Sequence, residues 1–161
     1  MSEKLPVTQR EIDYPESMVL MSHSDLTDVI TYANDAFVEI SGYTRDELIG
    51  ENHSIVRHPD MPQWVFADLW RTVKGGHPWR GCMKNRAKNG DHYWAAATVS
   101  PIMNNGNVVG YLALRKKPER EDVAKAEALY RSGKQPITRF SISNWFGKLS
   151  LQKKLQILLQ P

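Results

Sequence analysis

The sequence predicts an α+β domain: a five-stranded antiparallel sheet, with short helices and one longer helix on one face. Three stretches in the second half have a period of two and read as strands, namely Trp79–Ala87, Asp91–Met103 and Val108–Lys117. The two connections between them each contain Asn-Gly, the strongest short signal for a β-hairpin. Ahead of them, apolar residues recur at helical spacing from Gln63 to Lys74, which indicates one longer amphipathic helix.

Two further strands are expected near the N-terminus. Met18–Met21 and Val29–Tyr32 are short apolar runs, and the turn-forming residues of Ser22–Asp28 lie between them, so a pair of short strands joined by a turn is predicted. Met1–Pro15 has mixed charge, two prolines and no sustained period. We expect it to be an extended cap that is ordered only if it docks on the domain.

Two short helices are predicted between these strands and the longer helix. Asn34 is suited to be an N-cap, and Gly42 follows as a stop signal. Thr44 and Glu47 have the spacing of a capping box at the start of the second helix, and Gly50 is the stop signal of that helix. Pro62 at the first turn agrees with a start of the longer helix at Gln63.

The segment His53–Pro62 combines two imidazoles, a guanidinium, a carboxylate and two prolines in ten residues. The prolines exclude a long regular helix through it. Such a density of ionisable groups is unsuited to a core and suits a polar or charged ligand.

The middle strand of the second half carries small residues on both faces. Tyr93, Ala95, Ala97 and Val99 share one face, and Trp94, Ala96 and Thr98 share the other. These small residues leave room for a bulky group against the sheet, or they simply accommodate the tryptophans. Four of the five tryptophans lie between Trp64 and Trp94, where they serve as core or line the pocket of a flat aromatic ligand.

After Pro118, a helix with a thin apolar stripe is predicted over Glu119–Arg131. The stretch Leu149–Leu159 is leucine-rich and amphipathic, with basic residues around it. Four roles are open for such a helix: lying on a membrane, packing on a partner helix, dimerising, or folding back on its own domain.

Composition excludes several classes of function. A net charge of +3 is too small to indicate nucleic-acid binding. The single cysteine, Cys82, excludes an internal disulfide and any multi-cysteine metal site. No glycine-rich phosphate loop, Ser/His/Asp order or paired acidic site is present, so an enzyme is not expected. The start of the chain lacks the apolar core of a signal peptide.

From about Met18 to Arg115 the sequence resembles the PAS family of sensor domains. The motifs that carry the resemblance are Asn34-x-x-Phe37, Ser41-Gly42-Tyr43, Glu47-Leu48-Ile49-Gly50 and the run Asn85–Asp91. Within that family, Arg57-His58-Pro59-Asp60-Met61-Pro62 and Pro78-Trp79-Arg80-Gly81 are similar to the bacterial aerotaxis receptor family. This resemblance implies FAD held without covalent attachment, and a redox signal passed to a chemotaxis signalling module.

The resemblance also implies roles for particular residues. Arg57 offers a bidentate fork to the diphosphate of FAD, His58 a donor or a stacking ring, and Asp60 an acceptor for a ribose hydroxyl or a partner for Arg57. Asn34 and Asn85 carry amides that both donate and accept, and Asn85 is expected to face the pyrimidine edge of the flavin. The candidate ring walls, each with core packing as the alternative, are Trp70 and Trp79.

His53 occupies the position at which light-sensing flavin PAS domains carry their adduct-forming cysteine, in the run Gly50-Glu51-Asn52-His53. Thiol-adduct photochemistry is therefore not expected. Two alternatives stay open: a haem-binding gas sensor that uses His53, His58 or His77 as axial ligand, and a cofactor-free PAS interaction module.

The expected organisation is an N-terminal cap (1–17), a PAS sensor domain (18–117) and a helical connector (118–161). The resemblance implies a homodimer, a downstream signalling domain of the HAMP or methyl-accepting type, possible contact of the C-terminal helix with a membrane surface, and a cytoplasmic location at the inner face of the cell membrane.

Overall fold

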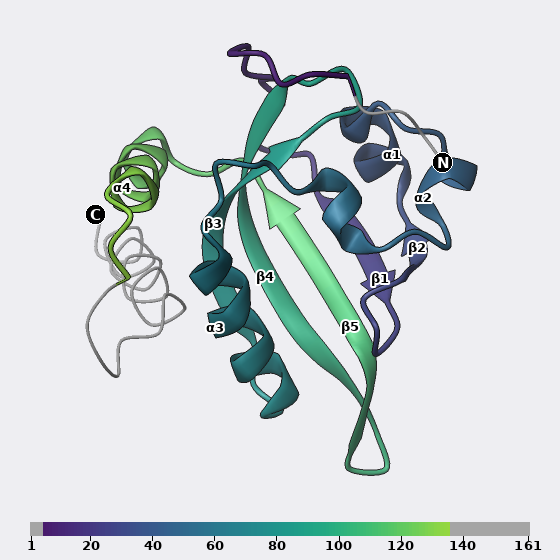
Figure 1. The fold of residues 1–161 in the computed structure, drawn as a ribbon. Helices are drawn as coiled ribbons and strands as arrows, with labels where there is room; N and C mark the ends of the chain where they lie inside the picture. The colour runs from purple at the N-terminus through teal and green to yellow at the C-terminus, as the bar shows by residue number, and fades with distance from the viewer. Residues whose placement is uncertain (1–4, 136–161) are drawn as a thin grey trace, which may run out of the picture.

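The computed structural model describes residues 5–135, and these form one antiparallel sheet with helices on both of its faces (Figure 1). The five strands lie in the order β2-β1-β5-β4-β3. Their bounds are β1 Leu20–Ser24, β2 Ile30–Ala33, β3 Trp79–Arg86, β4 His92–Asn104 and β5 Asn107–Lys116. The α+β class and the five-stranded antiparallel sheet predicted from the sequence are confirmed.

The helical elements between β2 and β3 cover one face of the sheet, which we call the inner face (Figure 1). They are α1 Asp35–Ser41, α2 Arg45–Leu48, the 3-10 turn η1 His53–Val56 and α3 Gln63–Lys74. The last helix, α4 Arg120–Arg131, packs on the opposite, outer face beside β3.

The helix signals in the sequence act as predicted because they are local. Asn34 Oδ1 accepts from Phe37 N at 3.0 Å, which caps α1. Thr44 and Glu47 form both halves of a capping box. At the tip of the β4–β5 hairpin, Asn105 and Gly106 both have positive φ, 49° and 79°. Positive φ at both central residues is what a two-residue hairpin turn requires.

The first two strands differ from the prediction. They start at Leu20 and Ile30 rather than at Met18 and Val29. The pairing of β1 with β5 runs from Leu20↔Arg115 to Ser24↔Tyr111, so β1 contains serines in place of the apolar residues ahead of it. Tertiary pairing therefore overrides the apolar pattern.

The N-terminal segment docks along the turn between β3 and β4. Leu5 N donates to Lys88 O at 3.1 Å, and Ile12 N donates to His92 O at 2.7 Å. At Gly90 the φ is +92°, and an added Cβ would lie 1.9 Å from Pro6 O. Only glycine fits a positive φ with a second chain this close.

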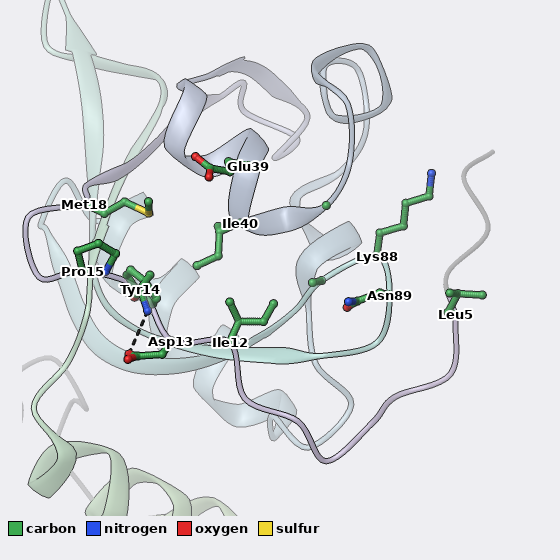
Figure 2. Close-up of a pocket in the computed structure, with 12 residues that line it drawn as sticks. Leu5, Ile12, Asp13, Tyr14, Pro15, Met18, Glu39, Ile40, Lys88 and Asn89 are labelled. Atoms are coloured by element: carbon green, nitrogen blue, oxygen red, sulfur yellow. Dashed lines mark hydrogen bonds between the residues drawn. The ribbon is translucent and has the colours of Figure 1, made fainter.

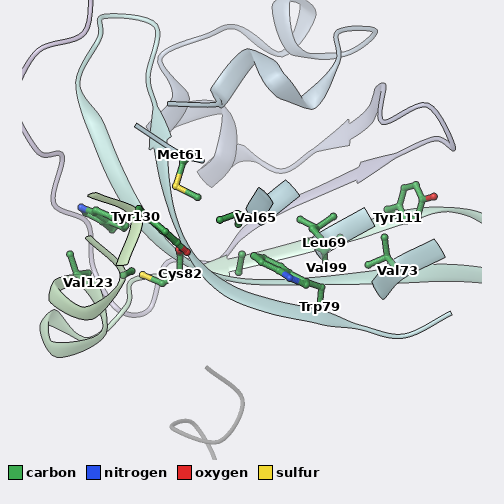
Figure 3. Close-up of a cluster of buried hydrophobic side chains, with 13 residues drawn as sticks. Met61, Val65, Leu69, Val73, Trp79, Cys82, Val99, Tyr111, Val123 and Tyr130 are labelled. Carbon is green, nitrogen blue, oxygen red and sulfur yellow. The ribbon is translucent and has the colours of Figure 1, made fainter. Parts of the chain in front are cut away.

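Two apolar clusters form the core, and the first of them extends from the inner to the outer face. The first joins α3 to β3, β4 and β5 and continues through Cys82 and Trp94 to α4, as Figure 3 shows with Trp79 between α3 and the sheet and Tyr130 on α4. The second joins α1, α2 and η1 to β1 and β2. Residues of both clusters line the cavity described below.

The last predicted helix starts at Arg120, one residue later than expected. The amphipathic stretch Leu149–Leu159 lies outside the described residues. Within residues 5–135, no helix has both the length and the apolar character needed to cross a bilayer.

Candidate functional site

A cavity of about 80 Å³ lies on the inner face, between η1, α3 and the strands β3, β4 and β5. Its walls come from elements that are far apart in sequence, so it is a product of the fold. The lining side chains are Ser24, Asp28, His53, Ser54, Val56, Arg57, Phe66, Leu69, Trp70, Met83, Asn85, Ala97, Val99, Tyr111, Ala113 and Arg115.

Most of the wall is apolar and partly aromatic. Leu69 and Trp70 project from α3, and the Trp70 ring meets the Tyr111 ring edge to face at 5.2 Å between centroids. On the sheet, Ala97 and Ala113 keep the floor low because they carry only a methyl group. The walls therefore suit a flat ring that lies against the sheet.

Two buried polar side chains, Asn85 and Arg115, line the cavity from different strands. Asn85 on β3 is 6% exposed and lines the cavity. Arg115 on β5 is 4% exposed; its Nη1 and Nη2 donate to Ser22 Oγ at 3.1 and 2.9 Å, while its buried Nε has no partner in the described part of the chain. A buried donor without a partner costs free energy, so the Arg115 Nε is available to a polar group of a ligand.

His53 is held neutral beside Arg115. Its Nε2 lies 2.8 Å from Ser22 Oγ. Because that hydroxyl already accepts from Arg115, we assign its hydrogen to His53 Nε2, which leaves the ring proton on Nδ1. Burial, with a smaller contribution from the Arg115 charge, lowers the pKa of His53 to about 3.

The mouth of the cavity is charged. The Arg57 guanidinium lies over the Phe66 ring, 3.6 Å from its centroid. Burial raises the pKa of Asp28 to about 6, against a hydrogen bond from Ser24 and the charges of Arg57 and Arg115. Next to the mouth is a second hollow of about 340 Å³, here called the outer hollow, which shares three residues with the cavity. It is lined by Leu26, Thr27, Asp28, Asn52, Arg57, Trp70 and Lys74.

Four of the eight residues expected at a cofactor line the cavity, namely His53, Arg57, Trp70 and Asn85. Asn34 lies elsewhere: besides capping α1, its Oδ1 accepts from Met21 N at 3.0 Å and its Nδ2 donates to Val19 O at 2.8 Å. Trp79 is fully buried in the core, and its Nε1 donates to Asp68 Oδ2 at 2.9 Å. The structure thus gives these two residues structural contacts and places them off the cavity wall.

The last two expected residues lie on the other side of β3. His58 is 3% exposed, and its Nδ1 accepts from Asp60 N at 3.0 Å. Asp60 pairs with Lys84, with 2.8 Å between Oδ2 and Nζ. Neither residue lines the cavity. Of the three histidines considered as haem ligands, His53 is the one among the cavity-lining residues, and its Nε2 is engaged by Ser22.

The sequence analysis missed Arg115, Tyr111 and Asp28. A signal for Arg115 was available, because Tyr111, Ala113 and Arg115 alternate with Leu112 and Leu114 along one strand. A charge in phase with the inward residues of a strand is expected to face inward. No comparable signal marked Asp28, which sits in the turn before β2 with φ +63°.

A larger but open trough of about 800 Å³ runs between the N-terminal segment and α1 (Figure 2). Ile12 and Ile40 face each other across it, and Glu39, Lys88 and Asn89 stand at its rim. None of the buried polar atoms that lack a partner within residues 5–135 belongs to its lining. The inner cavity is therefore the better candidate for a specific ligand.

Comparison with protein families matches residues 30–115 to the PAS fold. The chain is 44% identical over 156 residues to the aerotaxis receptor of Escherichia coli, an alignment that covers 92% of this chain and 31% of the receptor. It is 30% identical over 102 residues to the nitrogen fixation regulatory protein of Klebsiella pneumoniae, covering 63% of this chain and 21% of the relative. The chain thus spans about a third or less of the length of these relatives.

Among solved structures, the fold resembles that of the blue-light photoreceptor Aureochrome1 LOV in its dark state. The TM-score is 0.61 at 22% identity, over 70% of this chain and 84% of that one. A second structure, from a study of a flavin analogue in a light-oxygen-voltage domain, has a TM-score of 0.61 at 24% identity, over 72% of this chain and 88% of that one. At these identities the likeness supports the fold alone.

Proposed function

Because the chain belongs to the PAS family of sensor domains, we propose that its inner cavity binds FAD non-covalently and that the domain relays the redox state of the flavin to a chemotaxis signalling module. The coarser role, sensing of a signal by a PAS domain, follows from the family and from the aerotaxis receptor to which the chain is similar. The cofactor and the redox relay are the proposal.

The observation that carries the proposal is an apolar, aromatic-walled cavity whose lining includes the buried Asn85 amide and the buried Arg115 Nε, the latter without a partner in the described part of the chain. A flavin combines a flat apolar ring system with a pyrimidine edge that alternates carbonyl oxygens and nitrogens. The Asn85 amide can donate and accept at such an edge. The buried Arg115 cation favours negative charge next to it.

When bound, FAD would supply a reversible redox centre whose N5 accepts a hydrogen bond when oxidised and carries N–H when reduced. A primary amide can donate to the oxidised N5 and, after exchanging the positions of its oxygen and nitrogen, accept from the reduced N–H. A carboxylate can only accept. Asn85 lies on β3, where its backbone pairs with Tyr93 of β4 and bridges to Arg57. Reorientation of this amide would therefore act on the sheet and on the segment after η1.

Entry of the ring requires side chains at the mouth to move. The cavity of about 80 Å³ is smaller than the roughly 300–1,000 Å³ of typical ligand pockets. Arg57 and Phe66 stack on each other at the mouth, and the Arg57 side chain is exposed, so these are the groups that we expect to swing away. This rearrangement would join the cavity to the outer hollow.

The outer hollow favours a dinucleotide over FMN. It places two cations, Arg57 and Lys74, beside the mouth, where a diphosphate would leave the ring site. Asp28 and Asn52 supply oxygen atoms next to it for ribose hydroxyls. We infer that the adenosine half of FAD would lie there.

Non-covalent binding agrees with the position of the only cysteine. Cys82 is 2% exposed and packs with α4 residues, and burial raises the pKa of its thiol to about 12. A thiol that remains protonated is a poor nucleophile. His53, and not a cysteine, lines the cavity after η1 begins.

We further propose that residues 18–117 are the sensor unit between an N-terminal cap and a connector, and that the unit acts as a homodimer. Its output would go to a downstream signalling domain of the HAMP or methyl-accepting type in the same receptor, at the cytoplasmic face of the membrane. The similarity to the aerotaxis receptor over about a third of that protein's length supports this.

The test is reconstitution of the purified chain with FAD. We expect a yellow protein with one FAD per chain, oxidised-flavin absorbance bands and bleaching by dithionite. Flavin released by denaturation should be FAD when FAD and FMN are offered together, and Lys74→Gln should lower the FAD-to-FMN ratio several-fold. A folded protein that stays colourless would overturn the proposal in favour of a cofactor-free module, and a Soret band after incubation with haem would point to a haem sensor.

A further inference from the structure

The segment that connects η1 to α3 straddles the edge strand of the sheet. On the cavity side, the backbone of Arg57 forms a bridge with Asn85 of β3. Four residues later, Met61 reaches the same strand, and its Sδ accepts a weak hydrogen bond from Lys84 N at 3.4 Å. Adjacent residues of a strand point to opposite faces. Arg57 lines the inner cavity with Asn85, whereas Asp60 pairs with the neighbouring Lys84, so the segment reaches both sides of β3.

The outer end of this segment is fixed by a buried charge. Lys84 points away from the cavity and is 6% exposed, and its Nζ lies 2.8 Å from Asp60 Oδ2. Its aliphatic chain brings Nζ to 5.9 Å from the centre of the Trp94 ring. A buried ammonium that loses its carboxylate partner is costly, so Lys84 constrains where Asp60 can lie.

His58 fixes the backbone between the two ends. Its Nδ1 accepts from Asp60 N at 3.0 Å, and its carbonyl accepts from Met61 N at 3.1 Å. Burial first, and then the Lys84 charge, lower the pKa of His58 to about 4. The imidazole is therefore neutral and able to accept this bond at physiological pH.

We propose that Lys84, Asp60 and His58 are positioning residues that set the place of Arg57 at the cavity mouth, and that none of them touches the ligand. The three act as a clasp around β3, with Arg57 on the inner side and the Lys84–Asp60 ion pair on the outer side. This inference deepens the proposed function and rests on it where ligand affinity is the readout.

The clasp also borders the last helix of the described chain. Asp60, Met61 and Lys84 line a small hollow together with Glu127, Tyr130 and Arg131 of α4. From the start of α3, the Trp64 ring meets the Tyr130 ring at 6.1 Å. A shift of the clasp would thus reach α4, whose C-terminal end leads into the rest of the chain.

The experiment compares Lys84→Met, D60K and the charge-swapped double variant D60K/K84D with the wild-type chain. We expect Lys84→Met and D60K each to weaken FAD affinity about tenfold or more, the loss of roughly one charge-assisted contact. The double variant should recover most of that loss because the pair is restored with opposite polarity. Arg57→Gln combined with the swap should not recover.

A structural role alone would predict a different pattern. The Asp60 side chain is 62% exposed, so its carboxylate stays solvated when Lys84 becomes methionine, and Lys84→Met should keep its thermal midpoint near that of wild type while affinity falls. If Asp60 instead contacted the ligand, the double variant would bind no better than D60K, and that result would overturn the clasp.

A readout without ligand separates this inference from the proposed function. Amide hydrogen exchange of the apoprotein should accelerate at Met61 and Arg57 in Lys84→Met, with the β1–β5 pairing unchanged. If wild type fails to bind FAD, the proposed function fails, while the exchange result still decides the clasp. Unchanged exchange at both amides would contradict it.

Discussion

Buried polar groups of the domain fall into two regions that differ in whether the protein supplies their hydrogen-bond partners. In the packed region, Trp79 Nε1 donates to Asp68 Oδ2 at 2.9 Å, and Tyr130 OH donates to Cys82 O at 2.7 Å. In the cavity region, the Arg115 Nε has no partner among residues 5–135, and the buried Asn85 amide lines the cavity wall. Both regions are buried to a similar degree.

The difference teaches where a ligand belongs. The Trp79 indole and the Asp68 carboxylate satisfy each other within the packed core, so they stabilise the fold. Buried groups without a partner cost free energy unless something else satisfies them. Trp79, which was expected at the ligand, is therefore structural. Arg115, which was not expected there, lines the cavity.

Arg115→Met should have the largest effect, a loss of ligand affinity in the cavity region. Removing a charged hydrogen-bond donor costs roughly 1.5–3 kcal/mol of binding, which corresponds to a loss of FAD affinity of about 10- to 150-fold. The free energy of unfolding should change little, because the cost of burying this cation offsets what its hydrogen bonds to Ser22 contribute. Titration of the apoprotein with FAD, beside chemical unfolding, measures both. Wild-type affinity in this variant would contradict the assignment.

Asp68→Ala should instead lower the stability of the packed region. It leaves the buried Trp79 Nε1 without an acceptor, which costs about 1–3 kcal/mol of stability. The FAD bound per folded chain should stay at the wild-type value. Urea unfolding gives the first quantity and flavin absorbance the second. A variant that is stable but flavin-free would place Asp68 and Trp79 at the ligand.

Acid should weaken the apoprotein through His53. Its folded pKa of about 3 lies below the ordinary value of 6.5, so its contribution to stability is complete above pH 6.5 and is lost as the pH falls toward 3. The slope is at most about 1.4 kcal/mol per pH unit. Asp28, whose folded pKa is raised to about 6, acts in the opposite direction between pH 6 and 4.

The His53 contribution is isolated by comparing wild type with His53→Gln. Between pH 7 and pH 5, wild type should lose about 2 kcal/mol more of its unfolding free energy than the variant. Equal losses in the two proteins would mean that His53 is not held neutral by burial.

Asn34→Ala should have the smallest effect. Loss of the α1 cap and of its bonds to Met21 and Val19 should cost about 1 kcal/mol of stability, and FAD affinity should stay within about twofold. Calorimetry and FAD titration check the two parts. A loss of FAD affinity larger than the loss of folded protein explains would show that Asn34 contacts the ligand.

The sequence predicted what is encoded locally. The N-cap Asn34, the Thr44–Glu47 capping box and the Gln63–Lys74 helix depend on neighbouring residues, and the structure reproduces them. The start of β1 was misplaced because it is set by pairing with β5, which is far away in the sequence (Leu20 pairs with Arg115).

The site was predictable only in part for the same reason. His58 and Asp60 stand next to Arg57 in sequence, but the segment crosses the edge strand, and proximity along the chain does not tell which side a residue reaches. Arg115 could have been found from strand alternation. Asp28 depends on the packing of a turn against the cavity mouth, which no local pattern encodes.

The most direct test of the contrast between the two regions is nitrogen-detected or proton–nitrogen NMR of the chain during titration with FAD. We predict large shifts for the Arg115 Nε–H and the Asn85 side-chain amide as they gain partners, and a small shift for the Trp79 indole N–H, which keeps Asp68 as its acceptor. Saturating FAD that leaves the Arg115 and Asn85 signals in place, or that moves the Trp79 indole most, would contradict this assignment of the cavity.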